Sequence, residues 1–472
     1  MKDFSCYIAG KATAGDQWID VADPYSNEIV GRVPSLDKSH LEEAIAMTSS
    51  RLHDPLTRFQ RSEILRKTKT ILAERANEIS QLISFESGLC VRETNYEVGR
   101  ASDVLEFAAI EALKDDGQIF SCDLTPHGKS RKIFTTREPV NCVGSITPFN
   151  HPLNQVVHKV APAIACGAAT ILKPSLKTPL TAIRFAEMLY EAGLPGWMLS
   201  ILTGEDSVIA EGIVRHEEVD LISFTGSERV GRHISHTAGY KKLLLELGGN
   251  DPLIVLEDAD MDLAVKLACE GCFRNSGQRC TAVKRLMIQE SILDEFTQKF
   301  VELAKTYTVG DPRNPDTRVG TVIDEDAATV LENRVTAAVD SGAKVLLGGT
   351  RNGAQIEPTV IHNVPRDAEM VTKESFGPLA PIMGVKDLDD AIQLTNSATH
   401  GLSSGVVTND ISKAFHAIKN LRVGTCNINE VPGYRIESSP FGGIKDSGLG
   451  IKEGVIEAIK FMTNIKTFSF PW

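Results

Sequence analysis

The chain has no apolar run of the roughly 18 residues that a membrane-spanning helix needs. Its first twelve residues lack the basic segment followed by an apolar segment that marks a secretory signal. It also lacks an excess of positive charge, because 50 Lys and Arg stand against 62 Asp and Glu, for a net charge of -12. Such a balance disfavours general nucleic-acid binding. We therefore expect a soluble, cytoplasmic protein with neither a membrane nor a nucleic acid as partner.

Cysteines do not form the even, closely spaced set of a disulfide-stapled protein. There are nine, spread from Cys6 to Cys426, which argues against a disulfide framework. Cys269 and Cys272 have the CxxC spacing, but no second CxxC or His pair lies near them and the segment has a helical pattern. Ordinary packing is the favoured interpretation of this pair, and we expect no metal site.

With 472 residues the chain is too long for one ordinary hydrophobic core, so two or three domains are expected. Residues 1–35 indicate an extended, turn-rich lead-in. Apolar residues at helical spacing predict helices over 37–87 and 92–115. The polar, alternating segment 116–142 is typical of an exposed β-ribbon.

From residue 142 onward, short apolar runs of strand length alternate with helical stretches; the runs are CVGSIT, ATILKP, MLSILTG, VDLISFTG, LLLELGG and PLIVL. This alternation predicts a parallel sheet covered on both faces. Thr178 and Pro179 are predicted to be the N-cap and first residue of a helix that stops at Gly193. A second helix is expected over 258–274 with Asp258 or Asp260 as its cap, and the last residues, KTFSFPW, are expected to form a strand.

Four places carry residue types suited to chemistry. Cys280 lies in a loop of small residues, and Glu246 ends an apolar run, where burying a carboxylate is costly without a partner or a function. Asn150 follows the CVGSI run and could donate a hydrogen bond to an oxyanion. The segment 224–231 has the pattern of a strand, a glycine turn and a helix start, which can receive phosphate. Three of the four have a structural alternative: a buried Cys, an ion-paired Glu and a glycine turn that binds nothing.

Taken together, these places match a family. The sequence resembles the aldehyde dehydrogenase superfamily over nearly its whole length. The motifs that carry the resemblance are, in order, TPFN (147–150), ILKPS (171–175), FTGS (224–227), LELGG (245–249), GQRC (277–280), KESFGP (373–378) and PFGGIKDSGLG (440–450).

The resemblance implies a covalent mechanism on one thiol. Cys280 would attack the aldehyde carbon. The Asn150 amide and the backbone N–H of Cys280 would hold the oxyanion of the resulting thiohemiacetal. Loss of hydride to the nicotinamide would leave a thioester, and Glu246 would activate the water that hydrolyses it.

The resemblance also assigns a dinucleotide site. Lys173 would bind ribose hydroxyls, Glu374 would hold the nicotinamide ribose, and Phe376 would pack beside the nicotinamide. The full set of expected cofactor contacts is Ile146, Thr147, Pro148, Phe149, Lys173, Ser175, Leu176, Gly204, Phe224, Thr225, Gly226, Ser227, Val230, Leu247, Gly248, Glu374 and Phe376.

Two positions depart from the common pattern of the family. Many relatives carry a Glu that binds the adenine ribose where this chain has Leu176, followed by Lys177. The loss of that carboxylate removes an obstacle to a 2′-phosphate, and Lys177 either meets such a phosphate or is a solvated neighbour of a helix start. NAD is the favoured cofactor, with NADP left open. Asn250 replaces a commoner Lys, and the sequence gives no interpretation of it.

Basic residues near the expected site suggest a short aldehyde with an anionic tail. Arg279 precedes the nucleophile, His151 follows Asn150, Arg100 lies in a helical segment, and Arg435 lies before the PFGG motif; Thr281 is a further expected substrate contact. Arg presents a fork of donors suited to anions. The alternative for each cation is an ordinary surface residue or ion pair.

Within the family, the segments around these residues resemble phosphonoacetaldehyde dehydrogenases, which group with non-phosphorylating glyceraldehyde-3-phosphate and lactaldehyde dehydrogenases. The prediction is oxidation of phosphonoacetaldehyde to phosphonoacetate, with two Arg and a His balancing a dianion. Alternatives are glyceraldehyde 3-phosphate, succinate semialdehyde, sulfoacetaldehyde or lactaldehyde as substrate. A coenzyme A-acylating enzyme is disfavoured by Glu246, and a non-catalytic protein of the same fold is disfavoured by the intact catalytic set.

The family architecture implies an α/β fold in three parts. A Rossmann-like NAD(P)-binding domain would span 1–115 and 143–247, and an α/β catalytic domain would span 248–445. Residues 116–142 and 446–472 would form an oligomerisation element, because exposed strand edges invite pairing between subunits. A homodimer or homotetramer is therefore expected.

Overall fold

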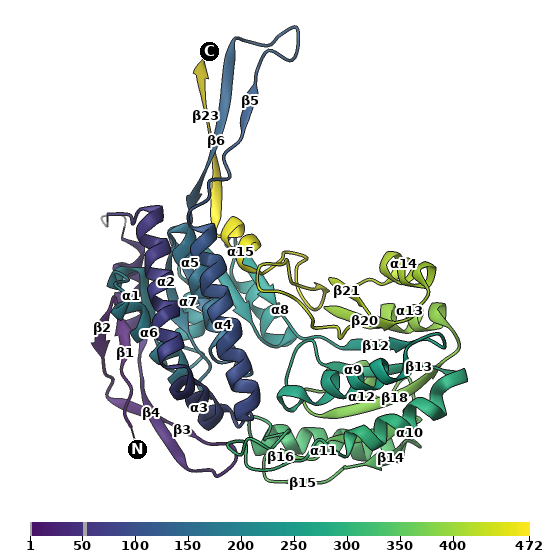
Figure 1. Ribbon diagram of the computed structural model, residues 1–472. Coiled ribbons are helices and arrows are strands. Elements are labelled where there is room, and N and C mark those ends of the chain that lie inside the picture. Colours follow the sequence, from purple (N-terminus) through teal and green to yellow (C-terminus); the bar gives the residue numbers. More distant parts are fainter. Residues whose placement is uncertain (1, 51–53) are drawn as a thin grey trace.

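The computed structural model describes residues 2–50 and 54–472. Two α/β lobes lie side by side, and a long β-ribbon projects away from the first of them (Figure 1). Each lobe is built around its own sheet, and each encloses a separate hydrophobic core.

The sheet of the first lobe is parallel except at one edge, and its strand order is β11-β10-β7-β8-β9-β1-β2. Its strands are β7 (Cys142–Ile146), β8 (Ala169–Lys173), β9 (Leu199–Ile201), β10 (Leu221–Thr225), β11 (Lys242–Glu246), β1 (Cys6–Ile8) and β2 (Lys11–Thr13). In chain order the parallel strands run 5-4-1-2-3, which is the strand order of a dinucleotide-binding Rossmann sheet without its sixth strand. The sequence direction of the connections reverses between β7 and β10, and ligands bind at such switch points.

The sheet of the second lobe has the order β14-β17-β18-β13-β12-β20-β21, in which only β14 is antiparallel. Its strands are β12 (Asp251–Val255), β13 (Val283–Gln289), β14 (Lys344–Leu347), β17 (Thr359–His362), β18 (Leu379–Val385), β20 (Ser403–Val407) and β21 (Thr425–Ile428). The parallel sheets expected from the strand–helix alternation are thus present in both lobes. Short strand pairs complete the chain: β3 (Gln17–Ala22) with β4 (Ile29–Ser35), β15 (Arg351–Asn352) with β16 (Gln355–Ile356), and β19 (His400–Gly401) with β22 (Ile444–Lys445).

Helices cover the sheets. Those of the first lobe are α1 (Lys38–Ser49), α2 (Arg58–Glu74), α3 (Ala76–Ser87), α4 (Val91–Glu111), α5 (Asn154–Cys166), α6 (Leu180–Glu191), α7 (Ile209–Arg215), α8 (Glu228–Thr237) and α15 (Val455–Phe461). Those of the second lobe are α9 (Met261–Phe273), α10 (Leu293–Ala304), α11 (Glu325–Asp340), α12 (Glu369–Thr372), α13 (Leu388–Ser397) and α14 (Ile411–Asn420).

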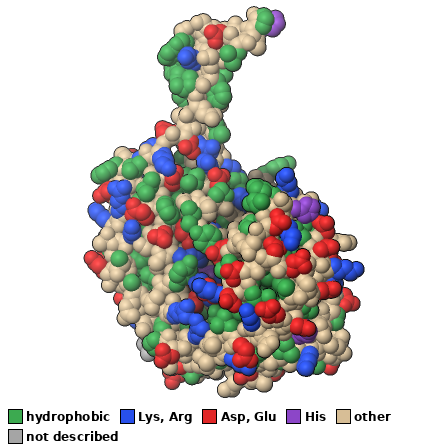
Figure 2. All heavy atoms as spheres, turned by 45° about the vertical axis from the view of Figure 1, so that its right-hand side comes forward, with side chains coloured by type: hydrophobic (Ala, Val, Ile, Leu, Met, Phe, Trp, Pro, Cys, Tyr) green, Lys and Arg blue, Asp and Glu red, His purple; other side chains and the backbone are tan. Residues whose placement is uncertain are grey.

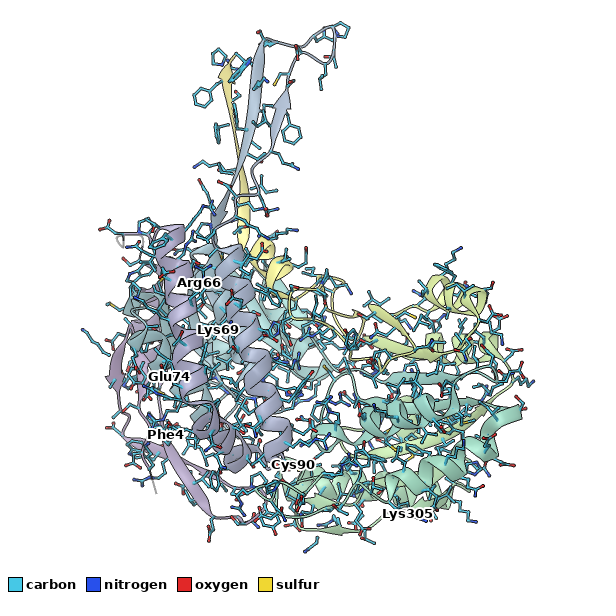
Figure 3. The ribbon with its side chains drawn as sticks, viewed as in Figure 1. Phe4, Arg66, Lys69, Glu74, Cys90 and Lys305 are labelled. Carbon is cyan, nitrogen blue, oxygen red and sulfur yellow. The ribbon has the colours of Figure 1, made fainter. Side chains whose placement is uncertain are left out.

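The two lobes contact each other at the N-terminal end of α4. Cys90, the residue before α4, lies there in Figure 3. The backbone N–H of Val91 donates to the carbonyl of Pro312 at 2.9 Å, and that of Thr321 donates to the carbonyl of Gly88 at 3.0 Å. The start of α4 is therefore fixed against the second lobe.

The start of α6 differs from the expectation that Thr178 caps it. Pro179 occupies the N-cap position and no capping side chain comes from the helix itself. Instead the buried carboxylate of Glu86, from α3, accepts hydrogen bonds from the N–H groups of Leu180 at 2.7 Å and Thr181 at 3.0 Å. A carboxylate at a helix N-terminus satisfies orphan donors and complements the helix dipole. A cap supplied from 94 residues away has no local sequence signal.

The start of α9 agrees with one of the two expected caps. The Asp260 side chain accepts from the N–H of Leu263 at 3.1 Å, whereas Asp258 accepts hydrogen bonds from Thr408 and Asn409. The CxxC pair lies on α9, where both Cys269 and Cys272 are buried in the second-lobe core. The packing interpretation of that pair is confirmed.

The ribbon consists of β5 (Ile119–Ser121), β6 (Arg131–Pro139) and the C-terminal strand β23 (Thr463–Pro471). Aromatic side chains follow β23 and the chain end, where Phe468, Phe470 and Trp472 are exposed; Figure 2 shows hydrophobic side chains along the projection. Helix α15, which precedes β23, packs on α4 and α5 of the first lobe. Within the described residues no helix has both the length and the apolarity to cross a membrane.

Candidate active site

A cavity of about 700 Å³ opens at the carboxyl ends of β7, β8 and β10, the switch point of the first sheet. The expected cofactor residues that line it are Ile146, Thr147, Pro148, Phe149, Lys173, Ser175, Leu176, Phe224, Thr225, Gly226, Ser227 and Val230. One wall is the start of α8, where the Ser227 side chain accepts from the N–H of Val230. The free N–H groups of the first helical turn suit a phosphate. The residues present therefore fit a dinucleotide.

The other expected cofactor residues lie outside this lining. Leu247 packs on Gly231 of α8, and Gly204 packs on Leu36 and Ile209. Glu374 accepts hydrogen bonds from the N–H of Gly249 at 3.1 Å and from Lys284 Nζ at 2.7 Å, and it lies close to Gly248.

Two aromatic rings mark the end of the cavity nearest to Glu374. Phe376 meets Phe149 edge-on, with ring centroids 5.9 Å apart. Phe149 lines the cavity, so this ring contact links the cavity lining to the segment that carries Glu374.

Sequence reasoning missed several charged residues of the cavity. Asp206 pairs with the ammonium of Lys173, and His233 contacts Glu211 at 2.8 Å; all four side chains belong to the lining. Asp206, Glu211 and His233 have no motif around them, whereas Lys173 lies in the ILKPS motif. Lys177 has its own partner, because its Nζ lies 3.0 Å from Asp324 of the second lobe.

The loop that carries Cys280 begins with residues in a strained backbone conformation. Asn275 and Ser276 have φ of 57° and 51°, in the left-handed region that is uncommon for residues other than glycine. Gly277 continues with φ 68°, and a Cβ there would lie 2.2 Å from the carbonyl oxygen of Gly377. Strained backbone of this kind persists where the surrounding structure holds it, commonly at functional sites.

Asn150 holds this loop to the first lobe. Its Nδ2 donates to the carbonyl of Gln278 at 2.9 Å, and its own carbonyl accepts from Asn275 Nδ2 at 3.0 Å. An amide nitrogen carries two donors. One N–H of Asn150 is thus used to fix its position, and the other is free to meet an oxyanion.

Lys284 clamps the other side of the loop. Its buried ammonium donates to the carbonyls of Gly249 and Cys280, each at 2.8 Å, and to that of Arg279 at 2.9 Å, and it pairs with Glu374 at 2.7 Å. These contacts tie together the LELGG, GQRC and KESFGP motifs, which are far apart in the sequence. Asn250 also has a structural role, because its buried Nδ2 donates to the carbonyl of Val371 at 2.7 Å.

Burial dominates the electrostatics of Cys280. It raises the pKa of the thiol to about 11, opposed by the positive charges of Lys284 and Arg435. At neutral pH the resting group is therefore the thiol. A base or a change of surroundings is needed to form the reactive thiolate.

Glu246 ends β11 as a buried carboxylate. Neither of its oxygens has a hydrogen-bond partner among residues 2–50 and 54–472. Burial and the negative charge of Glu453 raise its pKa well above the ordinary value, whereas Arg435, Lys159 and Lys452 act in the opposite direction. A carboxyl group with a raised pKa and no fixed partner is suited to take a proton from water.

Near Glu246 lies a buried ion pair, Lys159 with Glu453, that was not predicted from the sequence. The fully buried ammonium of Lys159, on α5, donates to Thr225 Oγ1 at 2.8 Å and to Ser223 Oγ at 3.1 Å, and it lies 3.4 Å from Glu453 Oε1. A lysine in an apolar helix is a recognisable signal. Its partner could not be identified without the fold.

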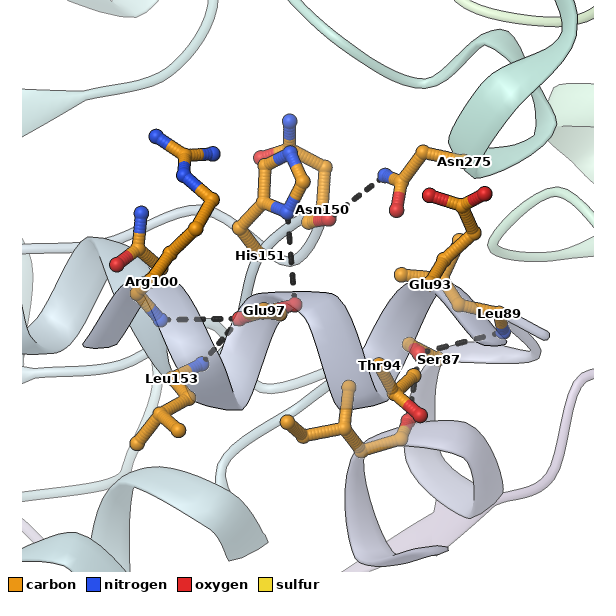
Figure 4. A network of polar contacts seen from close by, with 12 residues as sticks. Ser87, Leu89, Glu93, Thr94, Glu97, Arg100, Asn150, His151, Leu153 and Asn275 are labelled. Carbon is orange, nitrogen blue, oxygen red and sulfur yellow. Dashed lines mark hydrogen bonds and ion pairs between the residues drawn. The ribbon is translucent and has the colours of Figure 1, made fainter. Parts of the chain in front are cut away.

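The expected substrate cations are brought to the same region, each with contacts of its own. Arg100 and Glu93 extend from α4 toward the side where Asn150 and His151 lie (Figure 4). His151 Nδ1 lies 3.4 Å from Glu97 Oε2. Arg100 donates to Glu437, whose carboxylate also contacts His158 at 2.6 Å.

The remaining residues expected to contact the substrate lie in or beside the Cys280 loop. Arg279 Nη2 donates to the carbonyls of Glu270 at 2.9 Å and Gly271 at 2.7 Å near the end of α9. Thr281 lies against Gly433, where a Cβ would approach its Oγ1 to 2.3 Å. Arg435 stacks over Phe441, with 3.8 Å from Cζ to the ring centroid.

No cluster of His, Cys, Asp and Glu that could hold a metal ion is found in the part of the chain that the structure describes. The region instead combines the Cys280 thiol, a free amide donor of Asn150 and the unpartnered carboxylate of Glu246, and the cavity at the switch point begins at Phe149, the residue before Asn150. Such a set can perform nucleophilic attack, stabilise an oxyanion and activate water.

Comparison with known proteins agrees with this chemistry. The family model described as the aldehyde dehydrogenase family matches residues 11–468. Curated relatives include a lactaldehyde dehydrogenase of Methanococcus aeolicus, 37% identical over 95% of this chain and 96% of its own length. Another is a 3-sulfolactaldehyde dehydrogenase of Priestia aryabhattai, 35% identical over 98% of this chain and 97% of its own.

A solved structure shows the same fold. Aldehyde dehydrogenase 21 from Physcomitrella patens, in complex with the reaction product succinate, superposes with a TM-score of 0.95 at 35% identity and covers 99% of this chain and 98% of its own. A family match over nearly the whole length, together with that similarity, decides the class. The chain belongs to the aldehyde dehydrogenase family and is an NAD(P)-dependent dehydrogenase.

Proposed function

We propose that the protein oxidises a short anionic aldehyde to the acid through a thioester on Cys280, with phosphonoacetaldehyde as the predicted substrate. The thiolate of Cys280 adds to the aldehyde carbon, and the oxygen becomes an oxyanion. The free N–H of the Asn150 amide and the Cys280 backbone N–H stabilise that charge. Glu246 then takes a proton from water as the water attacks the thioester, which releases the acid and the thiol.

The cofactor is proposed to lie in the cavity at the switch point. Lys173 would hold its ribose hydroxyls, and the Thr225–Ser227 turn at the start of α8 would receive its pyrophosphate. Glu374 and Phe376 would bound its nicotinamide end. When bound, the nicotinamide supplies the hydride acceptor of the oxidation.

The main support for an anionic substrate is the positive charge of Arg279, which has no carboxylate partner among the described residues. Burial lowers the pKa of its guanidinium only to about 10, so it stays cationic at neutral pH. It is held by carbonyls, and no carboxylate lies within ion-pair distance of it among the described residues. Arg274 nearby is already paired with Glu93 at 3.0 Å. A half-buried cation beside the proposed nucleophile, lacking an anion of its own, favours a substrate that brings one.

The relatives support a small polar aldehyde. The Priestia relative is named for 3-sulfolactaldehyde, which carries a sulfonate, and the moss structure holds succinate, a dicarboxylate. The Methanococcus relative is named for lactaldehyde, which is neutral. A neutral lactaldehyde is thus the second candidate, and the charge at Arg279 favours the first.

Substitution of Arg279 tests this proposal. Arg279→Met is expected to lower kcat/KM about 100-fold for phosphonoacetaldehyde and only slightly for lactaldehyde, because a charged hydrogen-bonded contact is lost only with the anion. Steady-state NAD(P)H formation with both aldehydes measures the two values. The neutral substrate is the internal control, since a distorted Cys280 loop would harm both. Equal losses on the two substrates contradict the anionic tail.

Asn150 provides a separate test of the oxyanion role. Asn150→Ala is expected to lower kcat by about 100- to 1,000-fold, as loss of one oxyanion donor does elsewhere. The same change also removes the bond to Gln278, so the loop position is checked by the rate at which iodoacetamide alkylates Cys280. A loss of kcat with unchanged alkylation supports the oxyanion role, and unchanged kcat excludes it.

The ribbon is proposed to be an oligomerisation element. It projects from the first lobe with an antiparallel β23–β6 pair and exposed aromatic residues along β23. Apolar side chains and strand edges placed away from the body are suited to a partner subunit. A homodimer or homotetramer remains the expectation.

A further inference from the structure

Glu437 is a buried carboxylate on which three basic side chains converge. Its Oε1 accepts from Arg100 Nε, and its Oε2 lies 2.6 Å from His158 Nε2 and 4.0 Å from Arg435 Nη2. The Glu437 side chain is only 5% exposed. Arg100, His158 and Arg435 together lower its pKa below the ordinary range despite burial. The group is therefore a permanent negative charge.

The same basic residues face the reacting end of the site. Arg435 is close enough to lower the pKa of both Cys280 and Glu246. Arg100 extends toward Asn150 and His151 (Figure 4). The segment that carries Arg435 and Glu437 begins at Gly433, which lies against Thr281, the residue after the candidate nucleophile. Glu437 thus pairs with the cations that face the reacting end of the site.

The ion pairs of Glu437 then bear on the charge of the substrate tail. Its carboxylate faces Arg100 and Arg435, two of the residues expected to bind that tail. It therefore offsets part of the positive charge that they bring to the site. Without Glu437 the region would be more positive by one charge. A low-dielectric site is sensitive to a difference of one charge.

We infer that Glu437 helps to determine which tail charge the enzyme accepts, by opposing Arg100 and Arg435 and so disfavouring a doubly charged tail relative to a singly charged one. This rests on the proposed oxidation of an anionic aldehyde. It changes the charge balance expected from the sequence, because the two Arg and the His expected to bind a dianion were considered there without the opposing carboxylate of Glu437. A sulfonate or carboxylate tail enters with its one charge, and a phosphonate tail enters with one proton retained.

Two aldehydes of nearly the same shape test the inference. Sulfoacetaldehyde carries one negative charge, whereas phosphonoacetaldehyde carries two once its second proton is lost, and both tails are tetrahedral. The measured quantity is the ratio of kcat/KM for the phosphonate to that for the sulfonate, at a pH where the phosphonate is a dianion. In Glu437→Gln this ratio is expected to rise about tenfold, as removal of one opposing charge at several ångströms predicts. In Glu437→Asp it should return toward the wild-type value.

A purely structural role would give a different result. If Glu437 only supports the loop, Glu437→Gln lowers both values equally and the ratio stays constant, which overturns the inference. If Glu437→Gln does not fold, the pH dependence of the wild-type enzyme alone tests the inference. Its ratio should fall as rising pH converts the phosphonate to the dianion, while the sulfonate reaction at each pH corrects for titration of the protein. A constant or rising ratio overturns the inference.

The same panel separates failure of the proposed function from failure of this inference. A wild-type enzyme that oxidises lactaldehyde as efficiently as both anions contradicts the anionic substrate. A wild-type enzyme that prefers the anions, with a phosphonate-to-sulfonate ratio unaffected by Glu437→Gln, contradicts only the role of Glu437.

Discussion

Cys280→Ala is expected to lower kcat/KM for aldehyde oxidation by at least about 10⁴-fold, because removal of a covalent nucleophile leaves only binding and oxyanion stabilisation. NAD(P)H absorbance measures the loss. Cys122→Ala is the matched control, since Cys122 is a free thiol directly after β5, a strand of the ribbon that projects away from the first lobe (Figure 1). It should retain wild-type activity. Turnover by Cys280→Ala at more than about one hundredth of the wild-type rate would contradict a thioester mechanism.

The state of the thiol gives this prediction a pH dependence. Because burial raises the pKa of Cys280 to about 11, the thiolate fraction of the free enzyme increases tenfold for each pH unit below that value. Alkylation of Cys280 by iodoacetamide should follow the same slope across neutral pH. The absence of this slope would show that the thiol is already ionised at rest.

The local parts of the site could be predicted from the sequence. Cys280, Asn150 and Glu246 each lie in a short motif whose residues are neighbours in the chain. The parallel sheets also followed from local periodicity. The lining of the cavity followed because β7, β8 and β10 end side by side at the switch point, so their motifs meet there.

The partners that tune these residues could not be predicted, because they come from distant segments. Glu437 is 337 residues from Arg100 and 279 from His158. Glu453 is 294 residues from Lys159. A Glu in a loop has many structural roles, and only the fold shows which cations it meets. The cap that Glu86 provides for α6 was missed for the same reason.

The second large effect is expected at Glu246. Glu246→Gln removes the base but keeps the volume, so attack and hydride loss proceed and hydrolysis fails. Steady-state turnover should fall by about 10³-fold, in the middle of the range for loss of a general base. A burst of about one NAD(P)H per active site should remain, because the thioester accumulates. Loss of both burst and turnover would place Glu246 in an earlier step.

The pH dependence of hydrolysis identifies what tunes this base. Since only the carboxylate form accepts a proton, the rate should rise with pH through the raised pKa of Glu246. Glu453 raises that pKa and Lys159 lowers it, so their substitutions should act in opposite directions. Glu453→Gln should move the rising limb to lower pH, and Lys159→Met should move it to higher pH. The two side chains contact each other, so general damage to this buried pair would move both limbs alike, whereas opposite shifts arise only from their charges.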